Sequence, residues 1–423
     1  MGTVALRDVT KIFADGTIAV DNLSLDVAAG ELMVLLGQYG CGKSTVLRMV
    51  AGLEDPSSGA IMLNGVPASE MPAREHRITT QFPYTGDGSG GPSRRMARRP
   101  GLFLLDEPLS ACDSGLRPQF RAQLAALVRE LGVTTIYVTD DQAEALTMAD
   151  RVAILRRGAL QDVGTPTQVY NRPATLYVAA FLGGRRMNLL EAYVDAHAGR
   201  HIALHLGVQQ LHLPWDDTRS RAVANHHGER VVVGVRAEAL APVGPDAAGN
   251  VLRGRVQHVE RHGRDSLAML DIGAIGVAVE GLGGAPAQGP PPERSRLRRI
   301  NQAVQRFTGR VHAPAGRART ASPGAGGAAG ACAGSGAGPT GGWAPATGRG
   351  AAAGRLGALS SGCAPSLRGD PGRHRRVPAE LAVRLDAQPD PGAGEAVVVT
   401  VRMDALHFFD EHGRRIDSRW RSG

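Results

Sequence analysis

The chain has 423 residues, enough for two or three domains with hydrophobic cores, and no apolar run approaches the length of about 18 residues that a membrane-spanning helix requires. A hydrophobic content of 43% is normal for a globular protein, whereas 56 glycines and 26 prolines indicate at least one segment without a packed core. The N-terminus lacks a signal-peptide pattern, and the four cysteines lack metal-site or disulfide spacing, so we expect a cytosolic protein.

The formal net charge of +8 is concentrated in one segment. Residues 283–377 contain fourteen arginines against Glu293 and Asp370, which gives +12 and leaves −4 for the rest of the chain. This Arg/Gly/Ala/Pro-rich segment cannot bury enough apolar surface to offset the entropy of ordering, so we predict that it is disordered. Its aromatic residues are Phe307 and Trp343 alone, too few to stack on bases, so no specific nucleic-acid partner is expected.

Strands and helices alternate along the first part of the chain. Short, wholly apolar runs predict buried parallel strands, and apolar residues at helical spacing predict the helices between them. In chain order we predict strands at 3–13 and 18–27, a buried strand at 31–37, a helix at 42–53, a strand and turn at 61–69, a strand at 102–108, a helix at 116–131, a strand at 134–140, a helix at 141–149 and a strand at 150–158. This order predicts an α/β domain with a parallel sheet.

Short alternating strands replace this pattern from about residue 182. We predict them at 228–240, 253–263, 266–273, 379–387 and 395–410. They indicate a small β-barrel-like domain that the Arg-rich segment interrupts. The predicted organisation is therefore an α/β domain, the first part of a β-rich domain, a disordered segment and the last part of the β-rich domain, at 1–181, 182–282, 283–377 and 378–423.

The stretch GQYGCGKST at 37–45 has the glycine, lysine and serine spacing of a phosphate-binding loop, and Lys43 is one of only two lysines in the chain. It follows the predicted buried strand and begins the predicted helix, which argues against a coincidental glycine-rich turn. In such a loop, backbone N–H groups surround a β-phosphate, Lys43 neutralises the β/γ oxygens, and Ser44 holds Mg²⁺. The candidate ATP-binding residues are Gly37, Gln38, Tyr39, Gly40, Cys41, Gly42, Lys43, Ser44 and Thr45.

The stretch LFLLDEP at 102–108 supplies the other half of such a site. Asp106 ends a predicted buried strand, where its carboxylate can hold Mg²⁺ through water, and Glu107 can act as general base on an attacking water. Acidic pairs are common at strand ends, so this pair alone leaves the structural and the functional interpretation equally open. The phosphate-binding loop favours the functional one.

Several stretches together resemble the ATP-binding subunit of ABC transporters, specifically the carbohydrate importers of the maltose, trehalose and glycerol-phosphate group. They occur in the family order at 9–16, 37–65, 102–113, 133–155 and 163–190, and the stretches at 231–240 and 406–413 resemble the family's accessory β-domain. The resemblance implies a P-loop domain followed by an OB-type domain. It also implies an ATPase that works as a head-to-tail dimer on integral membrane permease subunits, at the cytoplasmic face of the inner membrane, to drive carbohydrate import.

The resemblance assigns further residues one by one. Phe13 matches the aromatic residue that stacks on adenine, with a buried core phenylalanine as the alternative. Asp113 matches the loop that communicates across the dimer. Gln81 lies where the family has a glutamine that senses Mg²⁺ and the attacking water.

One stretch departs from the family pattern between Gln81 and the strand at 102–108. The family's Leu-Ser-Gly-Gly-Gln signature is reduced to residues 89–91 followed by Pro92, and a proline there disrupts the helix start that would bind a partner's γ-phosphate. The family places a helical subdomain that contacts the permease before this signature. We therefore predict that the subdomain is largely missing near 82–95.

Asp140 is a second departure, because the family has a histidine at this catalytic position. The histidine donates a hydrogen bond to the γ-phosphate, and a carboxylate cannot do so unless it is protonated. Two like charges 4 Å apart also repel by about 1 kcal/mol in water and about 4 kcal/mol at an effective dielectric of 20. We therefore expect very weak hydrolysis.

Two explanations of the unusual segments remain open at this point. Residues 82–95 and 283–377 are either products of a shifted reading frame in GC-rich DNA or genuine variants. Two functions also remain open: an ATP-binding subunit that couples hydrolysis to carbohydrate import, and a non-hydrolysing nucleotide-binding or regulatory protein that has lost transport coupling.

Overall fold

The computed structural model describes most of the two predicted domains; its described residues are 2–70, 78–81, 101–110, 112–183, 187–197, 199–262, 265–282, 374–385 and 391–416. The missing subdomain predicted near 82–95 lies outside these residues, and so does all but the end of the segment predicted to be disordered. Among the described helices, none combines the length and the apolar character needed to cross a membrane.

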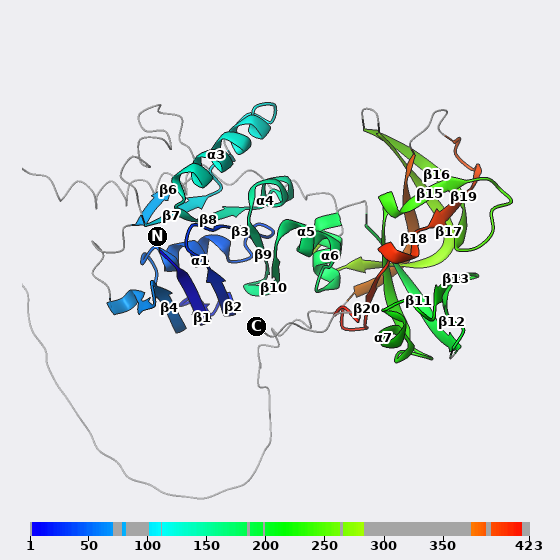
Figure 1. Ribbon diagram of the computed structural model, residues 1–423, viewed down its shortest axis with the longest axis horizontal. Coiled ribbons are helices and arrows are strands. Elements are labelled where there is room, and N and C mark those ends of the chain that lie inside the picture. The colour runs from blue at the N-terminus through cyan, green and yellow to red at the C-terminus, as the bar shows by residue number, and fades with distance from the viewer. Residues whose placement is uncertain are drawn as a thin grey trace, which may run out of the picture. The chain divides into compact units, whose positions relative to one another are not determined.

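The first sheet of the α/β domain is antiparallel and contains the N-terminal strands (Figure 1). Its strand order is β2-β1-β4-β5, with bounds Ile18–Val27, Val4–Ile12, Ser58–Leu63 and Val66–Pro67. Asn64 and Gly65 both adopt positive φ angles, of 55° and 79°, in the tight turn between β4 and β5. The strand and turn predicted at 61–69 are therefore confirmed.

The second sheet has the order β10-β9-β3-β8-β7-β6. The strands, in that order, are Ala159–Gly164, Arg151–Arg156, Leu32–Leu36, Thr134–Thr139, Leu102–Asp106 and Ile78–Gln81. All neighbouring pairs are parallel except β10 with β9. The carboxyl ends of β3, β8, β7 and β6 therefore lie at one edge of the sheet, which is where ligands bind in open α/β sheets.

Apolar side chains cover both faces of this parallel sheet. Met33 and Leu35 of β3 pack with the antiparallel sheet and with α1 (Lys43–Val50). Leu32, Val34 and Leu36 point to the other face, because successive residues of a strand alternate. The helices that contribute to the core on that face are α3 (Arg117–Leu131), α4 (Gln142–Met148), α5 (Pro166–Asn171) and α6 (Leu176–Gly183).

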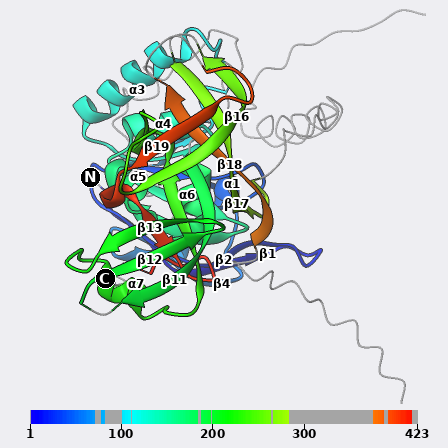
Figure 2. The same ribbon diagram turned by 90° about the vertical axis from the view of Figure 1, so that its right-hand side faces the viewer.

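The β-rich domain is one branched sheet of ten strands with antiparallel pairing. Figure 2 shows α7 (Ser220–Ala224) beside two of its strands, β11 and β12. The ten strands are β11 (Met187–His197), β12 (His201–Leu206), β13 (Gln209–Pro214), β14 (Arg230–Arg236), β15 (Leu240–Val243), β16 (Val251–His262), β17 (Asp265–Val279), β18 (His374–Leu385), β19 (Ala396–Val401) and β20 (His407–Phe409). Their inward side chains form a core of their own.

The predictions of a P-loop α/β domain and of a small β-rich domain after it are confirmed. Two predicted boundaries need correction. Helix α6 runs through the boundary placed at residue 181. Residues 374–377, which the prediction placed in the disordered segment, belong to β18, whose His374 pairs with Val279 of β17.

Candidate functional site

The loop at 37–45 joins the buried strand β3 to helix α1, as the sequence predicts. Gly40 and Gly42 have φ angles of 76° and 104°, in the left-handed region that favours glycine. A Cβ atom on Gly42 would lie 2.1 Å from the carbonyl oxygen of Ala19, so only glycine fits at this position. The backbone can therefore curve closely around a ligand at the N-terminus of α1.

Lys43 is buried at the base of this loop, with 4% of its surface exposed. Its ammonium group donates hydrogen bonds to the carbonyl oxygens of Gly37, at 2.8 Å, and of Gln38, at 3.0 Å. A buried cation next to the first N–H groups of a helix gives this end of the helix a positive potential. Such a potential favours the phosphates of a nucleotide.

Ser44 and Asp106 meet at the carboxyl edge of the sheet. The Ser44 hydroxyl donates to Oδ1 of Asp106 at 3.1 Å. Burial raises the pKa of Asp106, while this hydrogen bond and the nearby Lys43 act in the opposite direction. Two oxygen ligands together with substrate phosphates are the kind of set that Mg²⁺ accepts, so the residues fit the predicted ion. Within the described part of the chain, no three His, Cys, Asp or Glu side chains form a metal-binding group by themselves.

Glu107 follows β7 in an unusual backbone conformation. Its φ angle is 44°, and its N–H donates to the carbonyl oxygen of Val138 at 2.9 Å. Its carbonyl oxygen accepts a hydrogen bond from Ser110 Oγ at 2.8 Å. These bonds hold a strained residue in place, which is common for functional side chains. Burial raises the pKa of Glu107, and the negative charge of Asp140 raises it further.

Asp140 follows β8, between the loop after β3 and the acidic pair after β7. In the strand register, Thr139 is level with Leu36, and Val138 is level with Asp106. The side chain of Asp140 is exposed. Lys43, Asp106, Glu107 and Asp140 thus lie after neighbouring parallel strands of one sheet.

Glu144 of α4 bonds to side chains of β8 near this edge, and it was not identified from the sequence. It is 4% exposed and accepts hydrogen bonds from Tyr137 Oη and Thr139 Oγ1, both at 2.7 Å. Asp141 caps α4 by accepting from the backbone N–H groups of Ala143, at 2.7 Å, and Glu144, at 3.3 Å. The Asp-x-x-Glu spacing of 141–144 is a helix-start signal that could have revealed this cap, but not the bonds of Glu144 to Tyr137 and Thr139.

Phe13 begins the turn between β1 and β2. The residue is 38% exposed, which favours the predicted stacking surface over a core phenylalanine. The turn is closed by a bond from the Phe13 N–H to the Thr17 carbonyl at 2.9 Å, and Lys11 Nζ lies 5.4 Å from the ring centre. Gln81 ends β6 level with Leu105, at the expected edge, but its side chain lies outside the described set.

The remaining loop residues differ in their surroundings. Tyr39 is 93% exposed, whereas Cys41 is buried, and burial raises the pKa of its thiol. Gln38 Nε2 donates to the carbonyl oxygen of Gly281 at 2.8 Å, so the loop contacts the chain just after β17. Thr45 is half-buried within α1.

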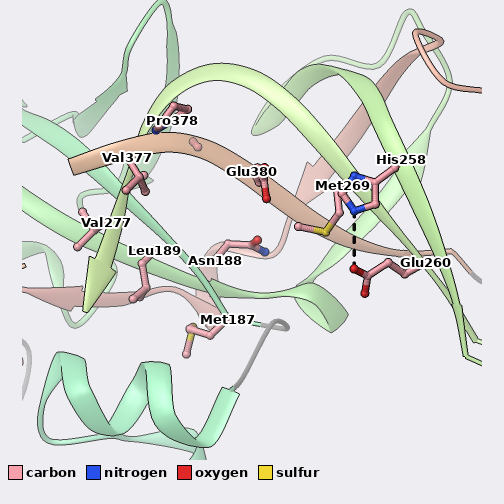
Figure 3. Close-up of a pocket in the computed structure, with 12 residues that line it drawn as sticks. Met187, Asn188, Leu189, His258, Glu260, Met269, Val277, Val377, Pro378 and Glu380 are labelled. Carbon is pink, nitrogen blue, oxygen red and sulfur yellow. Dashed lines mark ion pairs between the residues drawn. The ribbon is translucent and has the colours of Figure 1, made fainter. Parts of the chain in front are cut away.

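A separate cavity of about 430 Å³ opens in the β-rich domain (Figure 3). Met187, Leu189 and Met269 contribute apolar walls, and His258 and Glu260 form an ion pair of 3.7 Å at one side. None of its lining residues comes from the loop at 37–45. This cavity is therefore distinct from the candidate nucleotide site.

Comparison with known proteins agrees with this geometry. A family profile described as ABC transporter matches residues 20–86. The chain is 36% identical over 339 residues to the trehalose/maltose import ATP-binding protein MalK of Thermococcus litoralis, covering 65% of this chain and 90% of that protein. It is 34% identical over 351 residues to the sn-glycerol-3-phosphate import ATP-binding protein UgpC of Cereibacter sphaeroides, and 34% identical over 360 residues to the maltose/maltodextrin import ATP-binding protein MalK of Salmonella typhimurium, each covering 70% of this chain and 95% of the relative. The resemblance in the sequence is confirmed, and the chain belongs to the ABC transporter family of import ATP-binding proteins.

Proposed function

We propose that the chain is the ATP-binding subunit of a carbohydrate importer. The observation that carries the proposal is the loop at 37–45, in which the buried Lys43 bonds to the carbonyl oxygens of Gly37 and Gln38 at the start of α1. The relatives are import proteins for trehalose, maltose, maltodextrins or sn-glycerol-3-phosphate, which supports the choice of a carbohydrate or a related phosphate ester.

Each part of the site would contact a different part of Mg·ATP. Phe13 would stack on the adenine ring, and the loop N–H groups with Lys43 would bind the phosphates. Ser44, Asp106 and Gln81 would hold Mg²⁺, which supplies charge neutralisation on the phosphate oxygens when it is bound. Glu107 would accept a proton from the attacking water.

Hydrolysis by this chain would be slow. The γ-phosphate lacks the donor that Asp140 replaces, and the shortened signature at 89–91 lacks the helix start that would bind a partner's γ-phosphate. Removing one such donor typically lowers a rate by about 10²–10³. The proposal is therefore an importer subunit that keeps nucleotide binding and has lost most of its turnover.

The proposed partners are a second copy or a homologous cassette and a pair of membrane permease subunits, at the cytoplasmic face of the inner membrane. The alignments bear on the permease contact. The alignment with the Thermococcus protein is 339 positions long. It covers 65% of the 423 residues of this chain, which is about 275 residues, so about 60 positions of the alignment have no residue of this chain. A gap of this size supports the loss of a helical subdomain, for which the natural place is 82–95.

A non-hydrolysing regulatory protein is the alternative function. It would use the same loop and the same nucleotide, so binding alone does not distinguish it from a slow importer subunit. Hydrolysis that depends on Glu107 favours the importer subunit, and complete absence of hydrolysis favours the alternative.

Binding of a fluorescent ATP analogue tests the proposed site. We expect Lys43→Ala in the full chain to abolish binding, because it removes the buried cation that faces the phosphates. Arg7→Ala is a matched control, since Arg7 is an exposed cation paired with Asp26 on the surface of β1 and β2. Unchanged affinity in Lys43→Ala would place the nucleotide elsewhere.

A further inference from the structure

We infer that Asp140 makes this site selective for nucleoside diphosphates over nucleoside triphosphates. The inference rests on the proposed nucleotide-binding function and adds a preference that the intact loop alone does not predict. A diphosphate would occupy only the loop, whereas a triphosphate would place its last phosphate next to an additional carboxylate.

The half of the site that binds the β-phosphate is complete. Gly40 and Gly42 give the loop its curvature, and Lys43 and the first N–H groups of α1 supply positive potential. Arg48 adds a further positive charge near Asp106. Nothing in this half distinguishes a diphosphate from a triphosphate.

The half that would receive a γ-phosphate is dominated by carboxylates. A γ-phosphate extends from the loop toward the ends of the neighbouring strands, where Mg²⁺ and the attacking water belong. Glu107 follows β7 there, and Asp140 follows β8, which is hydrogen-bonded to both β3 and β7. Asp140 therefore lies between the start of the loop and Glu107, on the route that a third phosphate must take.

Asp140 also differs from the neighbouring acidic residues Asp141 and Glu144, whose carboxylates are bonded to other groups of the protein. Asp141 is engaged with the start of α4 and lies 3.8 Å from Arg117, and Glu144 is bonded to Tyr137 and Thr139. The described residues provide no hydrogen bond or ion pair for the carboxylate of Asp140. Its side chain is exposed at the end of β8, between the strand that leads into the loop and the strand that leads into Glu107.

The electrostatic effect acts on the γ-phosphate selectively. A like-charge contact of about 4 Å near a protein surface is sufficient for about a tenfold loss of affinity. The β-phosphate is bound deeper, beside Lys43, where the positive groups of the loop offset the more distant carboxylate. We therefore expect Asp140 to weaken triphosphate binding and to leave diphosphate binding nearly unchanged.

Calorimetric titration of the full chain with Mg·ADP and with the Mg complex of a non-hydrolysable ATP analogue tests this inference. The unaltered chain should bind ADP at least about tenfold more tightly than the analogue. Asp140→Asn removes the charge without changing the size of the side chain, so it should strengthen analogue binding about tenfold and change ADP binding less than about twofold. Asp140→His adds a donor and should strengthen analogue binding at least as much.

Glu130→Gln is the matched control, because Glu130 is an exposed acid on α3 and its removal changes the net charge equally. It should leave both affinities unchanged. Equal or tighter binding of the analogue by the unaltered chain would overturn the inference, and so would equal gains for both nucleotides in Asp140→Asn. Binding of neither nucleotide, or binding that persists in Lys43→Ala, would instead overturn the proposed function.

Discussion

Gly42 shows at the scale of one residue why the nucleotide loop tolerates so little change. Its φ angle of 104° is unfavourable for any side chain, and a Cβ atom would lie 2.1 Å from the Ala19 carbonyl oxygen. We expect Gly42→Ala to displace the loop, to abolish nucleotide binding and to lower the melting temperature. Thermal unfolding and analogue binding measure both effects.

Gly40→Ala is the matched control for this substitution. Gly40 also has a positive φ angle, of 76°, but a Cβ atom on it would meet no atom within 4 Å. The expected loss is backbone strain of about 1 kcal/mol without displacement of the loop. Equal damage from the two substitutions would contradict the steric explanation.

The pKa of the Glu107 carboxyl can be used to measure the electrostatic effect of Asp140. Burial is the main reason why the pKa of Glu107 is raised, and the charge of Asp140 is the next. Asp140→Asn should therefore lower the pKa of Glu107, while Glu130→Gln should leave it unchanged. A ¹³C NMR titration of glutamate-labelled protein measures the shift; a pKa that stays constant or rises in Asp140→Asn would show that the two carboxylates do not interact.

The loop and the acidic pair were predicted from their motifs, and Asp140 was predicted from the resemblance to the family. In the structure, these residues follow neighbouring parallel strands of one sheet. Glu144 was missed because its role depends on Tyr137 and Thr139, which are brought under it only when β8 and α4 pack. Sequence spacing alone carries no sign of such a contact.

At the scale of secondary structure, buried parallel strands were the most predictable elements, since their side chains are apolar on both faces. Helix α6 was missed because its eight residues, LYVAAFLG, are apolar all around and show no helical periodicity. The hairpin of β12 and β13 was missed because histidines and glutamines interrupt its apolar alternation. Helix α5 could have been found from its capping box, in which Thr165 and Gln168 bond to each other's backbone N–H groups.

A histidine on β13 gives the β-rich domain a predictable response to pH. Burial lowers the pKa of His212, and the neighbouring His201, His205 and His197 lower it further. Nδ1 of His212 is buried and has no hydrogen-bond partner among the described residues. Because the folded state disfavours protonation, its stability should fall as the pH drops through the unfolded value of 6.5.

His212→Gln should therefore make the loss of stability between neutral and mildly acidic pH smaller. His412→Gln is the control, because His412 is an exposed histidine in the turn after β20. Urea unfolding of the full chain at several pH values provides the measurement. An unchanged pH dependence in His212→Gln would show that this histidine is not the responsible group.

At the scale of the whole molecule, we propose that the chain keeps the elements that bind a nucleotide and has lost much of what would use its hydrolysis. The parallel sheet, the loop and the β-rich domain are all present, in agreement with relatives that the chain matches over 90–95% of their length. The alignment with the Thermococcus protein leaves about 60 positions without a counterpart in this chain, and the sequence at 89–92 departs from the family signature. We therefore expect nucleotide binding without efficient turnover.

Steady-state ATP hydrolysis by the purified full chain tests this central claim most directly. A typical enzyme turns over at about 10 s⁻¹, and the loss of γ-phosphate donors by Asp140 and by the altered signature should each remove about 10²–10³. We predict a turnover far below about 1 s⁻¹ in the presence of Mg²⁺, at nucleotide concentrations that saturate the loop. A turnover of about 1 s⁻¹ or more that Glu107→Gln abolishes would contradict the account, because it would show that the missing elements are dispensable for hydrolysis.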